Sequence, residues 1–218
     1  MPAKKKDEIE KTVFLAKTRG FCAGVKNAIN TVERLISESK SPVYVLHEIV
    51  HNRHVIKDLK KKGVIFVEDI ELVPPGANLV FSAHGVSAMI EKAAIQRGLK
   101  ITDATCPIVK KIHSKASSHS RKNWTLILIG HRSHPETIGT AGRAKGNCRI
   151  VENEKDVQKL PKNIGEKILC LTQTTLNPEE TSKIERAIKK KFGGKLLPLQ
   201  NNICYATVKR QNAVKKLA

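Results

Sequence analysis

Residues 108–129, IVKKIHSKASSHSRKNWTLILI, contain the pattern that decides the fold. A helix is expected over residues 108–118, and the run 125–129 (TLILI) has the length and composition of a buried strand. Amphipathic segments and short apolar runs alternate in the same way along the chain. Further helices are predicted over residues 25–36, 55–62, 88–97, 155–160, 178–191 and 206–217, and further strands over residues 12–16, 43–46, 64–67, 78–82, 149–151, 167–171 and 195–197. This alternation favours an α/β fold of repeated small units with mainly parallel sheets.

The composition limits the classes of protein to which the chain can belong. Its 218 residues are enough for one large or two small domains, and its net charge is +20. Such a charge favours nucleic acid, a membrane surface or an acidic protein as partner, although lysine-rich helix faces are the simpler interpretation. Aromatic residues make up only 4% of the chain, which argues against stacking platforms for single-stranded nucleic acid.

The lysine-rich start and the apolar runs bear on localisation. Residues 1–11 lack the apolar core of a secretory signal, and we expect them to be disordered. No apolar run approaches the roughly 18–20 residues that cross a membrane. The five cysteines are odd in number and widely spaced, which does not fit the disulfide framework of a small secreted domain. We therefore expect a cytoplasmic protein with no membrane partner.

Three of the cysteines share one local context, because each follows a loop and opens a segment of helical character. Cys22 lies in GFCAGVK, Cys106 in ATCPIVK and Cys204 in NICYATVK. The positive end of a helix lowers the pKa of a thiol, and the thiolate is the form that binds metals. Buried, inert cysteines are the alternative, and no C-x-x-C pair typical of structural zinc occurs. The repeated context predicts a metal or iron–sulfur site with three protein ligands and one open position.

Three histidines form the second constellation. His51, His84 and His134 each follow an apolar strand, and ligands bind parallel sheets at the carboxyl ends of strands. Imidazoles and free backbone N–H groups together form an anion pocket, although a lone histidine is more often an ordinary loop residue. Glu136 lies two residues beyond His134 and is a candidate proton donor. The hydroxyls of residues 172–175 (TQTT), which follow another strand, could bind a substrate oxygen.

Residues 47–51 (HEIVH) match H-E-x-x-H, the signature of zinc metalloproteases. That motif requires a helix, which places both imidazoles on one face. Here the strand predicted over residues 43–46 runs directly into His47. We therefore reject a zinc protease.

Together these segments resemble the 4-hydroxy-3-methylbut-2-enyl diphosphate reductase family of the non-mevalonate isoprenoid pathway. The resemblance extends from about residue 12 to the last residue and includes seven motifs in the same order. They are residues 19–25, 47–53, 81–86, 103–107, 130–136, 172–175 and 203–207.

The resemblance implies a pseudo-threefold arrangement of α/β units around a central [4Fe–4S] cluster. Cys22, Cys106 and Cys204 would hold the cluster, and its fourth iron would bind the hydroxyl or alkoxide oxygen of the substrate. We expect an N-terminal strand and loop over residues 12–21, a first unit over 22–105, a second over 106–200 and the start of a third over 201–218. Family members continue with a Ser-x-Asn motif and a further serine that bind the diphosphate, so we expect a fragment or a gene with a premature stop.

The reaction implied is reductive dehydroxylation, in which two electrons and two protons convert the small-molecule diphosphate into water and isopentenyl or dimethylallyl diphosphate. An acidic ferredoxin or flavodoxin would supply the electrons, and the positive net charge suits such a carrier. The resemblance assigns the diphosphate contacts to His51, His84 and His134, proton delivery to Glu136, and a place beside that glutamate and the substrate to Thr174.

Two alternatives remain beside this interpretation. A truncated, non-catalytic remnant of the reductase would conserve the motifs without the activity. A basic nucleic-acid-binding module is favoured by the charge alone, and no binding motif accompanies the charge.

Overall fold

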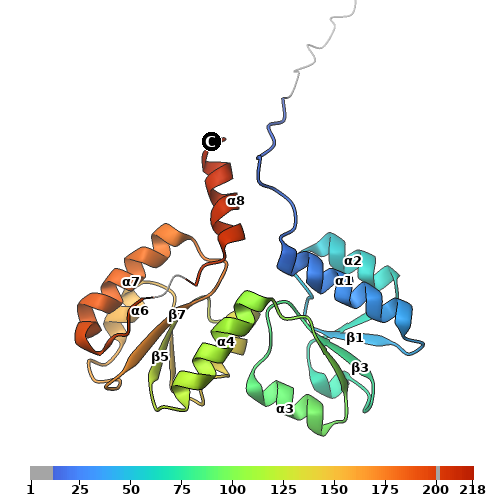
Figure 1. Cartoon of the computed structure of the whole chain (residues 1–218), viewed down its shortest axis with the longest axis horizontal. Helices are drawn as coiled ribbons and strands as arrows, with labels where there is room; N and C mark the ends of the chain where they lie inside the picture. Colours follow the sequence, from blue (N-terminus) through green and yellow to red (C-terminus); the bar gives the residue numbers. More distant parts are fainter. Residues whose placement is uncertain (1–11, 200–201) are drawn as a thin grey trace, which may run out of the picture.

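The computed structural model describes residues 12–199 and 202–218, and within these ranges the chain forms two parallel sheets with helices on both faces (Figure 1). The first sheet has the order β2-β1-β3-β4 and the second has the order β6-β5-β7. All strand pairs are parallel, which confirms the predicted α/β fold with parallel sheets. The expected disorder of residues 1–11 lies outside the described residues.

The strands of the first sheet are β1 (Val43–Leu46), β2 (Val64–Val67), β3 (Asn78–Phe81) and β4 (Lys100–Asp103). Those of the second are β5 (Thr125–Ile129), β6 (Cys148–Val151) and β7 (Ile168–Thr172). The helices are α1 (Ala23–Glu38), α2 (Arg53–Lys61), α3 (Ala88–Gln96), α4 (Pro107–Ser120), α5 (Pro135–Ala141), α6 (Glu154–Lys159), α7 (Pro178–Phe192) and α8 (Tyr205–Lys215), with short 3-10 turns η1 (Ile70–Leu72) and η2 (Gly193–Lys195).

Strand β5 shows why the TLILI run organises the second unit. All five of its residues are buried, and successive side chains point to opposite faces of the sheet. Ile127 and Ile129 pack in one apolar cluster with α6 and α7, whereas Leu126 and Leu128 pack in another with α4. A strand that is buried on both faces reads as a continuous apolar run, and helices must cover both sides of its sheet.

Helix termini follow local capping chemistry. Asn177 accepts hydrogen bonds from the N–H groups of Glu179 and Glu180, and Pro178 occupies the first position of α7. The last turn of α7 carries three lysines, which interact favourably with the negative end of the helix dipole. Helix α8 differs from the others, because none of its residues is buried and it extends away from both sheets (Figure 1).

The strand expected over residues 12–16 is wrong. These residues have no regular secondary structure, and Val13, Phe14 and Leu15 are largely exposed. An apolar run becomes a strand only where a neighbouring strand pairs with it, and no described strand does so here. The strand expected over residues 195–197 is reduced to one parallel bridge between Ile168 and Leu196.

Two elements were not predicted. Strand β4 (KITD) is a short edge strand with polar residues at both ends, so its apolar signal is weak. Helix α5 has only seven residues and begins with His134 as its N-cap. Within the described ranges, no helix is long and apolar enough to span a membrane.

Candidate functional site

The predicted site residues meet where the two sheets face each other, beyond the carboxyl ends of β1, β3, β5 and β7. A cavity of about 250 Å³ lies there, and residues of both units line it. Seven of the eight predicted residues belong to its wall: Cys22, His51, His84, Cys106, Glu136, Thr174 and Cys204. His134 completes the set, because its Nε2 lies 3.1 Å from Nε2 of His51.

Each of the three matched cysteines is the N-cap residue of a helix. Cys22 caps α1, Cys106 caps α4 and Cys204 caps α8, as their shared context predicted. The Cys22 sulfur accepts the N–H of Val25 at 3.5 Å. Three positive helix ends therefore converge on one cavity, and this favours thiolates there.

Gly24 allows two of these thiols to approach each other. A Cβ added at Gly24 would lie 2.9 Å from Sγ of Cys106 and 3.9 Å from Sγ of Cys22. The first distance is shorter than side chains tolerate, so any other residue at this position would push the Cys106 sulfur away. The glycine in GFCAGVK thus shapes the corner in which the sulfurs gather.

The thiols have different acidities. Burial raises the pKa of Cys22, but hydrogen bonds from Val25 and the Arg210 guanidinium oppose it, and the pKa lies below its usual value. Burial raises the pKa of Cys106, and the neighbouring Cys204 and Cys22 add to this effect. All three cysteines are free of disulfides. The surroundings of Cys22 therefore make its thiol more readily ionised than that of Cys106.

The three histidines form a compact triad. The rings of His51 and His84 are stacked with centroids 4.2 Å apart, and the ring of His134 meets both edge-on, at 4.9 Å from His51 and 5.5 Å from His84. One ring nitrogen from each lies within 4.8 Å of the others. Such a triad could bind either a metal ion or an anion, and the hydrogen bonds of the rings distinguish the two.

These hydrogen bonds favour an anion. Nδ1 of His134 accepts the N–H of Glu136 at 3.1 Å, so the neutral ring carries its proton on Nε2. Nε2 of His134 therefore donates, and it cannot offer a lone pair to a metal. Nδ1 of His51 lies 3.1 Å from the Glu48 carboxylate and donates to it, which leaves Nε2 of His51 to accept from His134.

Two of the three histidines, His84 and His134, are neutral as they stand. Burial, together with the neighbouring histidines, lowers the pKa of His84 to about 3, and the same causes lower the pKa of His134 to about 4. An anion placed among the rings would favour their protonated forms and raise both pKa values. The triad is thus a pocket whose positive charge develops when an anion arrives.

Glu136 is held by Thr174 inside the cavity wall. Glu136 is 3% exposed; its Oε1 accepts the N–H of Thr174 at 2.7 Å and its Oε2 accepts the Thr174 hydroxyl at 2.8 Å. Burial raises the pKa of this carboxyl, while the two hydrogen bonds act in the opposite direction. A buried carboxyl with a raised pKa is suited to donate a proton.

The HEIVH segment does not form a zinc-protease site. Residues 47–51 contain no helix, and His47 has a left-handed backbone with φ of 57°. Nδ1 of His47 pairs with Glu68 at 2.9 Å. The helix that the H-E-x-x-H motif requires is therefore absent from residues 47–51.

Comparison with known proteins follows this geometry. Residues 13–218 match the family described as LytB protein. The chain belongs to the LytB family. It is 47% identical over 206 residues to 4-hydroxy-3-methylbut-2-enyl diphosphate reductase 2 of Burkholderia mallei, covering 94% of this chain and 63% of that protein. It is 46% identical over 210 residues to the reductase of Neisseria meningitidis serogroup B, covering 96% of this chain and 65% of that protein.

Solved structures agree with this family assignment. The reductase from Plasmodium falciparum superposes with a TM-score of 0.86 at 44% identity, over 92% of this chain and 63% of that one. A second structure, titled as the terminal enzyme of the non-mevalonate pathway, gives a TM-score of 0.77 at 35% identity, over 94% and 72%. The LytB chain thus spans about 63% of the length of the first curated relatives. The predicted family and fold class are confirmed.

The cysteine corner of this LytB chain fits an iron–sulfur cluster. Three unpaired thiols line one cavity beside apolar side chains such as Val25 and Val109, and thiolates are the soft ligands that such clusters take. The glycine at position 24 leaves the space that a Cβ would fill beside two of the sulfurs. The cluster and the roles of the individual residues remain predictions.

Arg210 is a site residue that the sequence reasoning missed. It lies in α8, lines the cavity and hydrogen-bonds the thiol of Cys22. A guanidinium beside a thiolate offsets negative charge that three sulfurs would otherwise concentrate. Nothing in the sequence distinguished this arginine from the many other cations of the chain.

Proposed function

We propose that this LytB chain takes part in the reductive dehydroxylation of 4-hydroxy-3-methylbut-2-enyl diphosphate to isopentenyl and dimethylallyl diphosphate. The observation that carries the proposal is a single cavity that joins three helix-capping thiols, an anion-selective histidine triad and a buried carboxyl. The names of its relatives support the substrate. The reaction needs groups that bind an anion, groups that bind a metal and a group that donates a proton. Candidates for all three lie around the same cavity.

The histidine triad would bind the diphosphate. His134 presents Nε2–H, and His84 can gain a proton when the anion enters. Glu48 would orient the His51 ring through its contact with Nδ1. The diphosphate thus replaces the contact between the His51 and His134 nitrogens with charge-assisted hydrogen bonds.

Cys22, Cys106 and Cys204 would hold a [4Fe–4S] cluster. When bound, the cluster would supply electrons and a Lewis-acidic open iron for the oxygen that leaves the substrate. Gly24 keeps room for the sulfurs, and Arg210 balances their charge.

Glu136 would deliver the proton that turns the leaving oxygen into water. Burial raises its pKa, which favours the protonated form, and the Thr174 hydroxyl at 2.8 Å orients the carboxyl toward the cavity. The overall change adds two electrons and two protons, breaks one carbon–oxygen bond and releases one water molecule. We infer that an acidic carrier, a ferredoxin or a flavodoxin, delivers the electrons to the strongly basic protein, and that the reaction occurs in the reducing cytoplasm, where free cysteines persist.

Anaerobic reconstitution tests the proposal. The protein should bind about four irons per chain, as expected for one [4Fe–4S] cluster, and should convert the substrate when a chemical reductant is supplied. Cys204→Ser should lose iron, whereas Cys170→Ser is the matched control, because Cys170 is buried in β7 and away from the cavity. Absence of both cluster and turnover would overturn the proposal, and a cluster without turnover would favour the non-catalytic alternative.

A further inference from the structure

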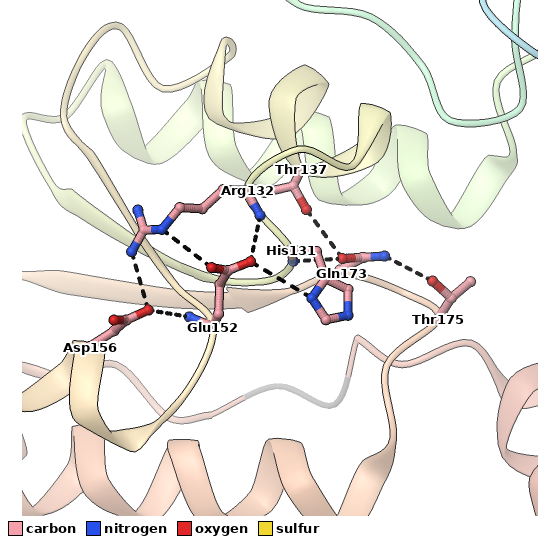
Figure 2. Close-up of polar contacts among 7 residues, drawn as sticks. All are labelled: His131, Arg132, Thr137, Glu152, Asp156, Gln173 and Thr175. Carbon is pink, nitrogen blue, oxygen red and sulfur yellow. Dashed lines mark hydrogen bonds and ion pairs between the residues drawn. The ribbon is translucent and has the colours of Figure 1, made fainter.

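Gln173 is a buried residue with no role in the site described so far. It is 3% exposed and lies between the end of β7 and Thr174. Its Oε1 accepts the N–H of His131 at 3.0 Å and the hydroxyl of Thr137 at 3.3 Å, and its Nε2 donates to the hydroxyl of Thr175 at 3.0 Å. Figure 2 shows this amide between the three groups. Through these hydrogen bonds the side chain connects the loop after β5, helix α5 and the loop after β7.

The backbone around Gln173 is packed as closely as its side chain. Its N–H donates to the carbonyl of Ile129 at 2.8 Å, which ties it to the end of β5. A Cβ added at Gly130 would lie 2.6 Å from the Thr137 hydroxyl and 3.2 Å from both Cβ and Oε1 of Gln173. The amide is thus closely packed at the carboxyl ends of β5 and β7.

The partners of the amide are neighbours of the reactive groups. Thr137 follows Glu136 in the first turn of α5, and Thr175 follows Thr174 in the loop after β7. The contact between the two loops at the reactive position is the pair of hydrogen bonds from Thr174 to the Glu136 carboxyl. Gln173 therefore connects the start of α5 to the loop after β7. These two segments must keep their relative positions for Thr174 to form both hydrogen bonds with Glu136.

We propose that Gln173 is a positioning residue whose side-chain amide holds Thr174 against the Glu136 carboxyl. Glutamine suits this position because its amide supplies an acceptor for two donors and a donor for a hydroxyl. A buried amide that loses its hydrogen-bond partners is left desolvated and unpaired, so the alignment resists displacement. The positioning itself does not depend on the proposed reaction; only its catalytic consequence does.

A second network of hydrogen bonds and ion pairs, formed by more exposed residues, also contacts the loop after β5. It is the alternative explanation for the alignment of Thr174 with Glu136. Glu152 accepts the N–H of Arg132 at 2.9 Å, and Asp156 accepts from the Arg132 guanidinium at 3.2 Å (Figure 2). The Arg132 side chain is 54% exposed, and ion pairs in such surroundings contribute little. We therefore expect the inner amide to dominate the alignment, and Glu152→Gln supplies the matched control.

Amide hydrogen exchange measured by NMR tests the positioning directly in the full chain. The Thr174 N–H is bonded to Oε1 of Glu136, so its exchange rate reports whether that contact is kept. In Gln173→Met, which keeps length and removes the amide, the Thr174 N–H should exchange about tenfold faster relative to the Leu169 N–H in the middle of β7. Leu169 reports the stability of the sheet as a whole.

The outcomes separate positioning from simple stabilisation. An equal acceleration at Thr174 and Leu169, or faster exchange of Thr174 in Glu152→Gln than in Gln173→Met, would overturn the proposal. Thr137→Val removes one of the three hydrogen bonds and should give a smaller, selective acceleration, which keeps the test decisive if Gln173→Met does not fold. If exchange changes as expected but the kcat of an active preparation does not fall, the positioning stands and its catalytic consequence is refuted; a preparation without turnover bears on the proposed reaction alone.

Discussion

His113 makes the stability of the protein fall in acid through one buried ring. It is 7% exposed within α4, and its Nε2 has no hydrogen-bond partner among the described residues. A Cβ added at Gly85 would lie 2.5 Å from its Cε1, so the ring fills its space. Burial, and then the charge of Arg143, lower the pKa of His113 from 6.5 to about 4, although Asp103 acts in the opposite direction.

The effect of this pKa on stability can be worked out by linkage. The unfolded chain takes up a proton at this histidine as the pH falls through 6.5, whereas the folded chain does so only near pH 4. Stability is therefore fully present above pH 6.5 and is lost as the pH falls toward 4. The loss from this residue amounts to about 2 kcal/mol at pH 5 and approaches about 3.4 kcal/mol below pH 4.

Replacement of the ring by a group that cannot ionise should remove this loss. Urea unfolding of wild type and His113→Leu at pH 8 and pH 5 measures it, and the variant should lose about 2 kcal/mol less between the two pH values. His54→Gln removes a solvent-exposed histidine from α2 and should behave as wild type. Parallel pH dependence in wild type and His113→Leu would refute the reasoning, because it would mean that the buried ring takes up its proton without cost.

Three further outcomes are expected. Gly142→Ala should destabilise the fold by about 1–3 kcal/mol in urea unfolding, because its Cβ would lie 2.3 Å from a serine Cβ in the loop between β3 and α3; unchanged stability would contradict this packing. Inorganic pyrophosphate should be bound with uptake of a proton by His84, so that its affinity falls as the pH rises; calorimetric heats that do not depend on the buffer would disprove it. Gly24→Ala should lower the iron content after reconstitution, since its Cβ would displace the Cys106 sulfur, and full iron loading would exclude that displacement.

The parts of the fold that could be read from the sequence are those with a local cause. The TLILI run of β5 is apolar throughout because helices cover both of its faces, and Pro178 with Asn177 marks the start of α7. The three cysteines were predicted to precede helices, and all three are N-caps. Residues 12–16 show the limit of this reading, because an apolar run does not state whether a partner strand exists.

Details of the site depended on contacts between distant segments. The sequence named His134 and Glu136 as candidates, but it did not show that α5 begins there or that His134 carries its proton on Nε2. The sequence did not single out Gln173, because two of its three side-chain partners, His131 and Thr137, come from another part of the chain. Arg210 was hidden among the 40 lysines and arginines. Tertiary packing determines which residue of a common type lies at the site, and a sequence pattern does not contain that information.

Helix α8 follows the proposed ligand Cys204 and is not anchored by a core. None of its residues is buried, and polar contacts connect it to the rest of the chain, among them the Cys204 N–H with the Thr174 carbonyl at 2.8 Å and Lys215 with Glu179. Metal binding at Cys204, the N-cap residue of α8, would add to the free energy that orders this helix. Protease sensitivity of α8 would therefore act as a gauge of metal loading, so that peptide cleavage, rather than colour or turnover, would reveal when the thiols are empty.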